Sequence, residues 1–149
     1  MRTKREGIRC GEEGWTFIET IIVLAIVLTL SSTVGVLGFR YVGQAKRAAA
    51  RNQIESLGLA LSGYLFDCGS YPSQAQGLEA LWKQPGVAPV PEEWRGPYIE
   101  KMIKADPWGN PYRYIVPGPD GLPYGISSLG SDGREGGEDE AKDLHSWRE

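Results

Sequence analysis

Residues 14–39 begin Gly14-Trp15-Thr16-Phe17-Ile18-Glu19-Thr20, continue with a nearly unbroken apolar run from Ile21 to Leu30, and end in small and apolar residues up to Phe39. Between Trp15 and Phe39 the only charged side chain is that of Glu19. A helix of this length would extend about 37 Å, which is enough to cross a hydrocarbon core of about 30 Å with some tilt. We therefore predict a transmembrane helix over residues 15–39.

The carboxylate of Glu19 is the exception in this apolar stretch. A charge inside a membrane-spanning helix costs about 2.5–3.5 kcal/mol or more, so such a group normally has a partner and a function. The apolar stretch holds no basic residue that could meet it. Cleavage after Gly14 would give Trp15 a positive α-amino group, and the amine of a neighbouring copy could neutralise Glu19. The alternative is an ordinary single-pass anchor with an incidental glutamate.

These residues carry a resemblance. Gly14 followed by Trp-Thr-Phe-Ile-Glu resembles the class III signal of type IV pilins and type II secretion pseudopilins. In that family a prepilin peptidase cuts after the glycine and methylates the new amino terminus, which is usually phenylalanine. The resemblance implies that residues 1–14 are a leader, that Trp15 is the processed terminus, and that Glu19 acts in filament assembly.

The charge distribution favours a chain that crosses the membrane once. The leader carries a net charge of +1, which leaves −4 for the rest of the chain. Basic residues before the apolar stretch favour a cytoplasmic amino terminus, so the bulk of the chain should lie on the other side. A secretory signal peptide fits poorly, because the apolar run is longer than the roughly 7–15 apolar residues of a signal peptide and holds a glutamate near its start. The acidic chain has no basic patch, which argues against nucleic acid as a partner.

All ten prolines lie at position 72 or beyond, which permits one unbroken helix from about Thr16 to Asp67. Its second half, residues 40–68, is an amphipathic continuation. The apolar residues there recur at spacings of three and four and should form one buried face; they are Ile54, Leu57, Leu61, Tyr64 and Cys68. Cys10 belongs to the leader, so the processed chain has a single thiol, Cys68, and no internal disulfide.

Residues 69–149 should form one modest globular domain. Ser73 and Gln76 resemble a capping box that opens a short helix to about Lys83, with Leu78, Leu81 and Trp82 on its buried face. Strand composition over 112–116 and 124–129, with a turn at 117–121, predicts an antiparallel hairpin. The expected fold is therefore α+β, with a small antiparallel sheet packed on the second half of the long helix.

The segment 129–143 is acidic and rich in glycine. It holds six acids, which are Asp132, Glu135, Glu138, Asp139, Glu140 and Asp143. From composition alone, a solvated and mobile segment is favoured. The alternative is a calcium loop, because calcium takes 6–8 oxygen ligands from carboxylates and carbonyls, and glycines let the chain wrap around the ion.

Several motifs in the globular part resemble the major pseudopilins of type II secretion systems. They are Tyr71-Pro72, Gln76-Gly77-Leu78-Glu79-Ala80-Leu81, Gly96-Pro97-Tyr98-Ile99, Asp106-Pro107-Trp108-Gly109-Asn110-Pro111-Tyr112 and Ser128-Leu129-Gly130-Ser131-Asp132-Gly133. Their order and spacing together are specific. The resemblance implies a pilin-like fold with structural calcium at the carboxyl-terminal loop. The implied ligands are the Asp132 side chain, the carbonyls of Leu129 and Arg134, and the later acids Asp139 and Asp143, for which Glu138 or Glu140 could substitute.

The function that the resemblance implies is a structural subunit of the type II secretion pseudopilus, polymerising through its amino-terminal helix to support export of folded proteins across the outer membrane. The chain would be anchored once in the bacterial inner membrane, with its globular domain in the periplasm. Expected partners are other copies of itself, minor pseudopilins, an inner-membrane assembly platform and prepilin peptidase. The alternatives are a minor pseudopilin, a type IV pilin subunit, or a monomeric membrane-anchored binding module.

We expect no catalytic site. The chain has no phosphate-cradling glycine loop, no zinc-ligand spacing and no convincing nucleophile–base pair. Its single histidine, His145, lies beside acidic residues and is expected to be a surface residue.

Overall fold

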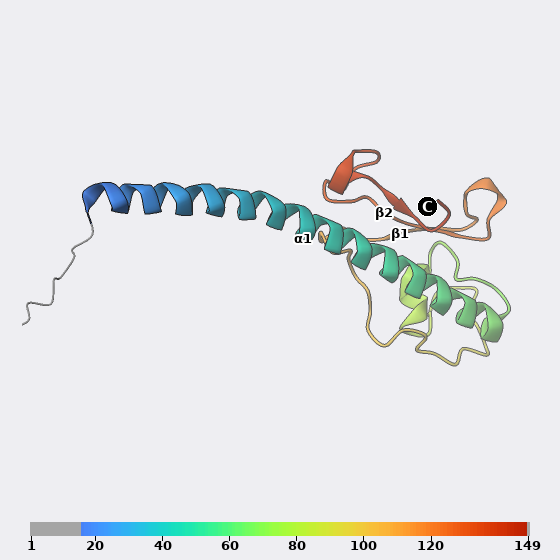
Figure 1. Cartoon of the computed structure of the whole chain (residues 1–149). Helices are drawn as coiled ribbons and strands as arrows, with labels where there is room; N and C mark the ends of the chain where they lie inside the picture. The colour runs from blue at the N-terminus through green and yellow to red at the C-terminus, as the bar shows by residue number, and fades with distance from the viewer. Residues whose placement is uncertain (1–15, 149) are drawn as a thin grey trace, which may run out of the picture. The chain divides into compact units, whose positions relative to one another are not determined.

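The structure of the chain, a computed structural model, describes residues 16–148, without the side chains of residues 33–40. The leader, its cleavage at Gly14 and the processed terminus at Trp15 therefore lie outside the described residues. The chain divides into two units, residues 1–40 and 41–149. The described elements are α1 (Phe17–Cys68), the 3-10 helices η1 (Gly77–Leu81), η2 (Pro119–Gly121) and η3 (Asp139–Ala141), and the strands β1 (Arg113–Ile115), β2 (Gly125–Ser128) and β3 (Leu144–His145) (Figure 1).

Helix α1 confirms the predicted long helix almost to the residue. Thr16 caps its amino end, because its hydroxyl oxygen accepts a hydrogen bond from the backbone N–H of Glu19 at 3.3 Å. Gly69 ends it with a φ of 73°, and its N–H donates to the carbonyl of Leu65 at 2.8 Å. Pro72 prevents continuation. The helix therefore begins and ends where local chemistry dictates.

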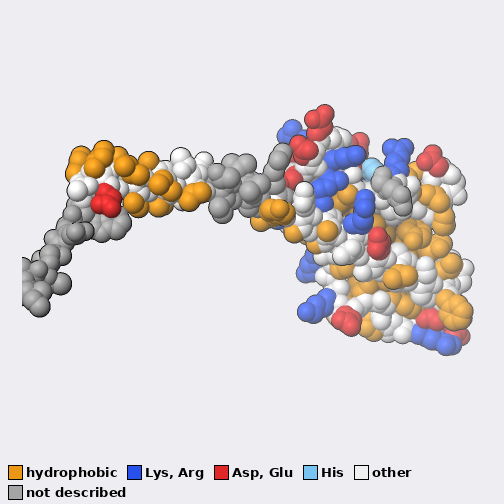
Figure 2. All heavy atoms as spheres, in the orientation of Figure 1, with side chains coloured by type: hydrophobic (Ala, Val, Ile, Leu, Met, Phe, Trp, Pro, Cys, Tyr) orange, Lys and Arg blue, Asp and Glu red, His pale blue; other side chains and the backbone are white. Residues whose placement is uncertain are grey.

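The first half of α1 carries apolar side chains that the unit itself leaves uncovered. Figure 2 shows hydrophobic side chains along this part of the helix, and the described ones from Phe17 to Leu30 are exposed. Among the described residues, no helix is both long and apolar enough to cross a membrane. The predicted span at residues 15–39 includes Trp15 and the side chains of residues 33–39, which lie outside the described part.

The core of the second unit is built on one face of α1. The face consists of Ala50, Ile54, Leu57, Ala60, Leu61 and Tyr64, all buried. The predicted stripe is thus confirmed, with Cys68 partly buried at its end. Ala80 and Leu81 from η1, Tyr114 from β1, Ile126 from β2 and Leu144 from β3 complete the core cluster. Burying a leucine or isoleucine side chain stabilises a fold by about 1.5–3 kcal/mol.

The sheet has three antiparallel strands in the order β1-β2-β3. The predicted hairpin is confirmed, with Tyr114 opposite Ile126 in the register. Strand β2 is central and its residues are buried throughout. Strand β3 pairs Leu144 with Ser128. The sequence does not predict this strand, because two residues are too few to produce an alternating pattern.

The segment after α1 corrects one prediction. Ser73 and Gln76 form the expected reciprocal pair, since the Ser73 N–H donates to Gln76 Oε1 at 2.9 Å and the Gln76 N–H donates to Ser73 Oγ at 3.3 Å. The helix that follows is 3-10, however, and Trp82 is 40% exposed rather than buried. At three residues per turn Leu78 and Leu81 share one face, and the next residue turns away from it.

We predict that the fold is lost steeply at alkaline pH because of its buried tyrosines. Burial raises the pKa of Tyr64 to about 12, and burial also raises the pKa of Tyr98, Tyr112, Tyr114 and Tyr124. Unfolded tyrosines ionise near pH 10, at about their unperturbed pKa. The stabilisation from these protonated phenols is therefore complete below about pH 10 and is lost as the pH rises toward about 12.

Far-ultraviolet circular dichroism and tyrosine absorbance at 295 nm, recorded over one alkaline titration, measure this loss. The ionisation of the core tyrosines should accompany the loss of helical signal. Full ionisation of all tyrosines near pH 10, in a chain that keeps its native helical signal, would contradict the prediction.

Candidate functional site

The candidate site is the acidic loop, residues 129–143, whose two ends are joined by the sheet. The loop leaves β2 after Ser128 and returns at Leu144, and these two residues are register partners. Within it lies the short helix η3. Its carboxyl end is therefore fixed against its amino end by strand pairing, although few of its own residues are apolar.

The loop backbone also packs closely on itself. The N–H of Ser131 donates to the carbonyl of Glu140 at 3.0 Å. Gly130 has a φ of 63°, and a Cβ placed there would lie 2.7 Å from the carbonyl oxygen of Ala141. Gly137, with a φ of 93°, approaches the same oxygen equally closely. Glycine at these two positions is what allows the two sides of the loop to meet.

A buried carboxylate supports the start of the loop. Asp106 is 6% exposed, and its Oδ1 accepts the N–H groups of Trp108 at 3.0 Å and Asn110 at 2.8 Å. Its Oδ2 accepts the hydroxyl of Ser128 at 2.6 Å. The side-chain amide of Asn110 donates to the carbonyl of Gly130 at 2.7 Å. The turn over residues 106–111 thus fixes the residues at which the loop begins.

The predicted calcium ligands differ in their burial and in their hydrogen-bond partners. Asp132 is exposed, and its Oδ1 accepts the N–H of Arg134 at 3.1 Å. Asp143 accepts the N–H of Gly136 at 3.0 Å through Oδ2, whereas its Oδ1 is buried and has no hydrogen-bond partner among the described residues. Leu129 is buried immediately after β2, and Asp139 is the first residue of η3, with a positive φ of 50°.

The donors available in the loop are of the type that calcium takes. A buried carboxylate oxygen without a partner is costly, and a bound cation at Asp143 would satisfy it. Over residues 16–148, no three histidine, cysteine or acidic side chains lie close enough together to hold a metal. A calcium ion here would therefore depend on backbone carbonyls as well as carboxylates, which is the ligand mixture expected for this metal.

Two contacts from outside tie the loop to the rest of the domain. The guanidinium of Arg47, on α1, donates through Nη1 to the carbonyls of Asp139 and, at 3.2 Å, Lys142. Arg113, on β1, forms an ion pair with Glu135. The sequence pattern predicts neither contact. The partners of Arg47 are backbone carbonyls 92 and 95 residues away in the chain, which leave no local signal.

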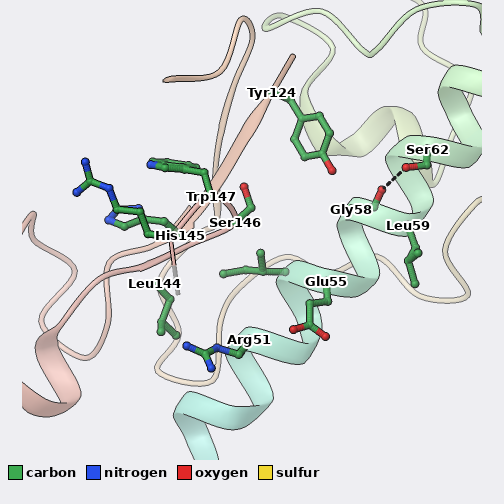
Figure 3. Close-up of a pocket in the computed structure, with 12 residues that line it drawn as sticks. Arg51, Glu55, Gly58, Leu59, Ser62, Tyr124, Leu144, His145, Ser146 and Trp147 are labelled. Carbon is green, nitrogen blue, oxygen red and sulfur yellow. Dashed lines mark hydrogen bonds between the residues drawn. The ribbon is translucent and has the colours of Figure 1, made fainter. Parts of the chain in front are cut away.

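Residues 144–148 and helix α1 line an open groove of about 760 Å³ (Figure 3). One wall comes from α1, with Arg51, Glu55 and Leu59, and the other from Tyr124 and residues 144–148. The rings of His145 and Trp147 stack there, with centroids 4.6 Å apart. His145 is half-buried and lines this groove.

Glu19, the predicted assembly residue, lies in the first turn of α1 and is exposed. Within the described part of the chain its carboxylate makes no hydrogen bond or ion pair, while its backbone N–H binds Thr16. A carboxylate in the first turn also interacts favourably with the helix dipole. This position is compatible with the predicted role in assembly, which stays a prediction.

The fold defines the class of protein. A long amino-terminal helix, of which one face packs on a three-stranded antiparallel sheet, followed by a loop region closed by the last strand, is a pilin-like α+β arrangement. The crystal structure of the major pseudopilin from the type 2 secretion system of enterohaemorrhagic Escherichia coli matches this chain with a TM-score of 0.60 and 34% identity. The match covers 70% of this chain and 88% of that one.

Sequence comparison gives the family. Residues 38–147 match the family described as type II secretion system (T2SS), protein G. A type II secretion system core protein G from Pseudomonas aeruginosa is 40% identical, over 91% of this chain and 95% of that protein. The protein of the same name from Vibrio cholerae is 39% identical, over 91% and 92%. The chain belongs to the type II secretion system protein G family.

We predict that Asp106→Ala destabilises the domain by at least about 2 kcal/mol, because two N–H groups and a hydroxyl would lose their acceptor. Asp106→Asn, which keeps one oxygen, should cost less. Glu92→Ala, which removes an exposed carboxylate, should stay within about 0.5 kcal/mol. Urea unfolding curves of the four chains measure this order, and equal midpoints for Asp106→Ala and the parent chain would refute it.

Proposed function

We propose that this chain is a structural subunit of the type II secretion pseudopilus. The observation that carries the proposal is the agreement of sequence and fold with core protein G along most of the chain. These relatives are core proteins G and a major pseudopilin, which favours the major subunit over the minor pseudopilins and type IV pilins that the leader motif alone would allow. The role is structural, and the chain would act by assembling with other subunits.

The first half of α1 is the proposed assembly element. A long series of exposed apolar side chains, such as those from Phe17 to Leu30, is costly in water and marks a surface that lipid or protein covers. We infer that this half inserts in the inner membrane and afterwards packs against the same half of sister subunits. The globular domain would then lie in the periplasm. Prepilin peptidase would process the chain after Gly14, and minor pseudopilins and an assembly platform would initiate and extend the filament.

Glu19 is the proposed determinant of subunit incorporation. Its carboxylate lies in the first turn of α1, four residues after the proposed processed terminus at Trp15. In a membrane, the positive α-amino group of an adjacent subunit would offset the cost of this charge. The interaction exists only between subunits displaced along the helix axis, so it favours a staggered filament over a lone helix.

Calcium is the proposed structural ligand of the acidic loop, held by the carbonyls of Leu129 and Arg134 together with carboxylates from Asp132, Asp139 and Asp143. Because these three side chains do not form a cluster in the described structure, ion binding would have to draw them together. Support comes from the family resemblance and from the buried, unpartnered oxygen of Asp143. When bound, the ion would neutralise several like charges in one short segment and add the cross-links that its apolar content cannot supply. Hydrogen bonds from Asn110 and Arg47 position the loop backbone, and the bound ion would stabilise that conformation further.

We predict that Glu19→Ala abolishes filament assembly and leaves membrane insertion unchanged, because the substitution makes the helix more apolar while removing the group that meets the sister amine. Glu55→Ala removes the same kind of side chain from the exposed surface of the same helix and should leave assembly intact. Cross-linking of engineered cysteines in membranes measures the ladder of staggered subunits.

Mass spectrometry of the amino terminus is the control for this experiment. Both variants should begin at Trp15, which separates a failure of assembly from a failure of processing. Normal filaments from Glu19→Ala would remove the proposed role of the carboxylate.

We predict that calcium raises the melting temperature of the full chain in detergent micelles. At a free calcium concentration of about 100 times Kd the added stability is about 2.7 kcal/mol. Asp143→Asn should remove most of this increment, whereas Asp120→Asn, in the turn at η2, should retain it. Scanning calorimetry with calcium and with chelator measures the difference, and identical melting in the two buffers would end the calcium proposal.

A further inference from the structure

The contact between Arg47 and the acidic loop has a position that suggests more than surface packing. The guanidinium donates to two backbone carbonyls, those of Asp139 and Lys142, and is half-buried between α1 and the loop. The carbonyl of Lys142 belongs to the peptide unit that leads into Asp143, and that of Asp139 belongs to one of the proposed ligands itself. Arg47 therefore fixes the backbone on which two of the proposed ligand side chains are mounted.

The backbone at this point has an uncommon conformation. Asp139 has a φ of 50°, in the left-handed region that few residues other than glycine adopt, although aspartate does so more often than most. The N–H of Lys142 donates to the carbonyl of Asp139 at 3.4 Å, which closes η3 weakly. The charged guanidinium makes the stronger, charge-assisted bonds to the same turn.

One helical turn before Arg47, the surface of α1 is shaped for the loop. Gly43 is buried, and a Cβ at this position would lie 2.0 Å from Oε1 of Glu140. A glycine in the interior of a helix is unfavourable by about 0.5–1 kcal/mol relative to alanine. Its presence here leaves room for the Glu140 side chain against the helix. Gly43 and Arg47 together form the surface of α1 against which the segment 139–142 packs.

We propose that Arg47 is a positioning residue for the calcium site, holding the segment 139–142 so that Asp139 and Asp143 are placed for the ion, and thereby coupling calcium occupancy to helix α1. The inference rests on the calcium site proposed above. Arg47 has two opposing effects on calcium affinity. Its positive charge repels the cation, although solvent weakens this repulsion, whereas its hydrogen bonds preorganise the ligands. Residues that orient metal ligands from outside typically change affinity by about 10–100-fold, so positioning should dominate.

The experiment compares the full chain in detergent micelles with three arginine variants. Arg47→Gln removes the charge and the forked donor, Arg47→Lys keeps the charge without the fork, and Arg51→Gln is the matched control from the next turn of α1. Isothermal titration with calcium gives Kd, and calorimetric melting in chelator gives the stability of the calcium-free chain. We expect Arg47→Gln to weaken calcium binding by about tenfold or more, Arg47→Lys to weaken it less, and Arg51→Gln to leave it within about twofold.

Three outcomes would overturn the inference. If the parent chain binds calcium and Arg47→Gln binds it equally well or more tightly, positioning by Arg47 is wrong while the calcium site stands. If Arg47→Gln lowers the melting temperature equally in calcium and in chelator at unchanged Kd, Arg47 serves the fold alone. If the parent chain does not respond to calcium, the calcium proposal fails, and the role of Arg47 fails with it.

Discussion

The burial of one face of α1 is the constraint on which the globular part depends. The three strands are only three, four and two residues long, and a sheet of this size cannot build a core alone. The helix supplies the missing half through residues from Ala50 to Tyr64, against which Tyr114, Ile126 and Leu144 pack. The same helix continues toward its amino end with apolar side chains that nothing in their own unit covers. One element thus serves a folded domain at one end and, as we propose, a membrane or filament at the other.

The acidic loop obtains its shape from polar contacts where apolar ones are scarce. Asp106 gathers its own turn and Ser128 at the start of the loop, Asn110 binds the carbonyl of Gly130, and Arg47 binds the turn near its end. Each contact reaches the loop through a buried or half-buried polar group, where the surrounding low dielectric strengthens hydrogen bonds. Such a framework gives a segment of like charges a defined backbone without relying on apolar contacts.

The features that could be predicted from the sequence are those encoded locally. The placement of the prolines and the Gly69 stop gave α1, the three–four spacing gave its buried stripe, and two strand-like runs about a turn gave the hairpin. Strand β3 could not be predicted because two residues are too few to form an alternating pattern. The burial of Trp82 is wrongly predicted because η1 has three residues per turn. The acidic loop was recognisable by composition and resemblance. Its supports at Arg47 and Gly43 were not, since contacts between segments more than ninety residues apart leave no local trace.

The pairing of Ser128 with Leu144 has an evolutionary consequence. Because the sheet itself joins the two residues that bracket the acidic loop, the intervening chain can change in length without disturbing the core. Each doubling of a flexible loop costs only about 0.6 kcal/mol of closure entropy. Insertions and deletions in this family should therefore accumulate between β2 and β3, where lineages can vary the outer surface of a subunit while its foundation stays constant.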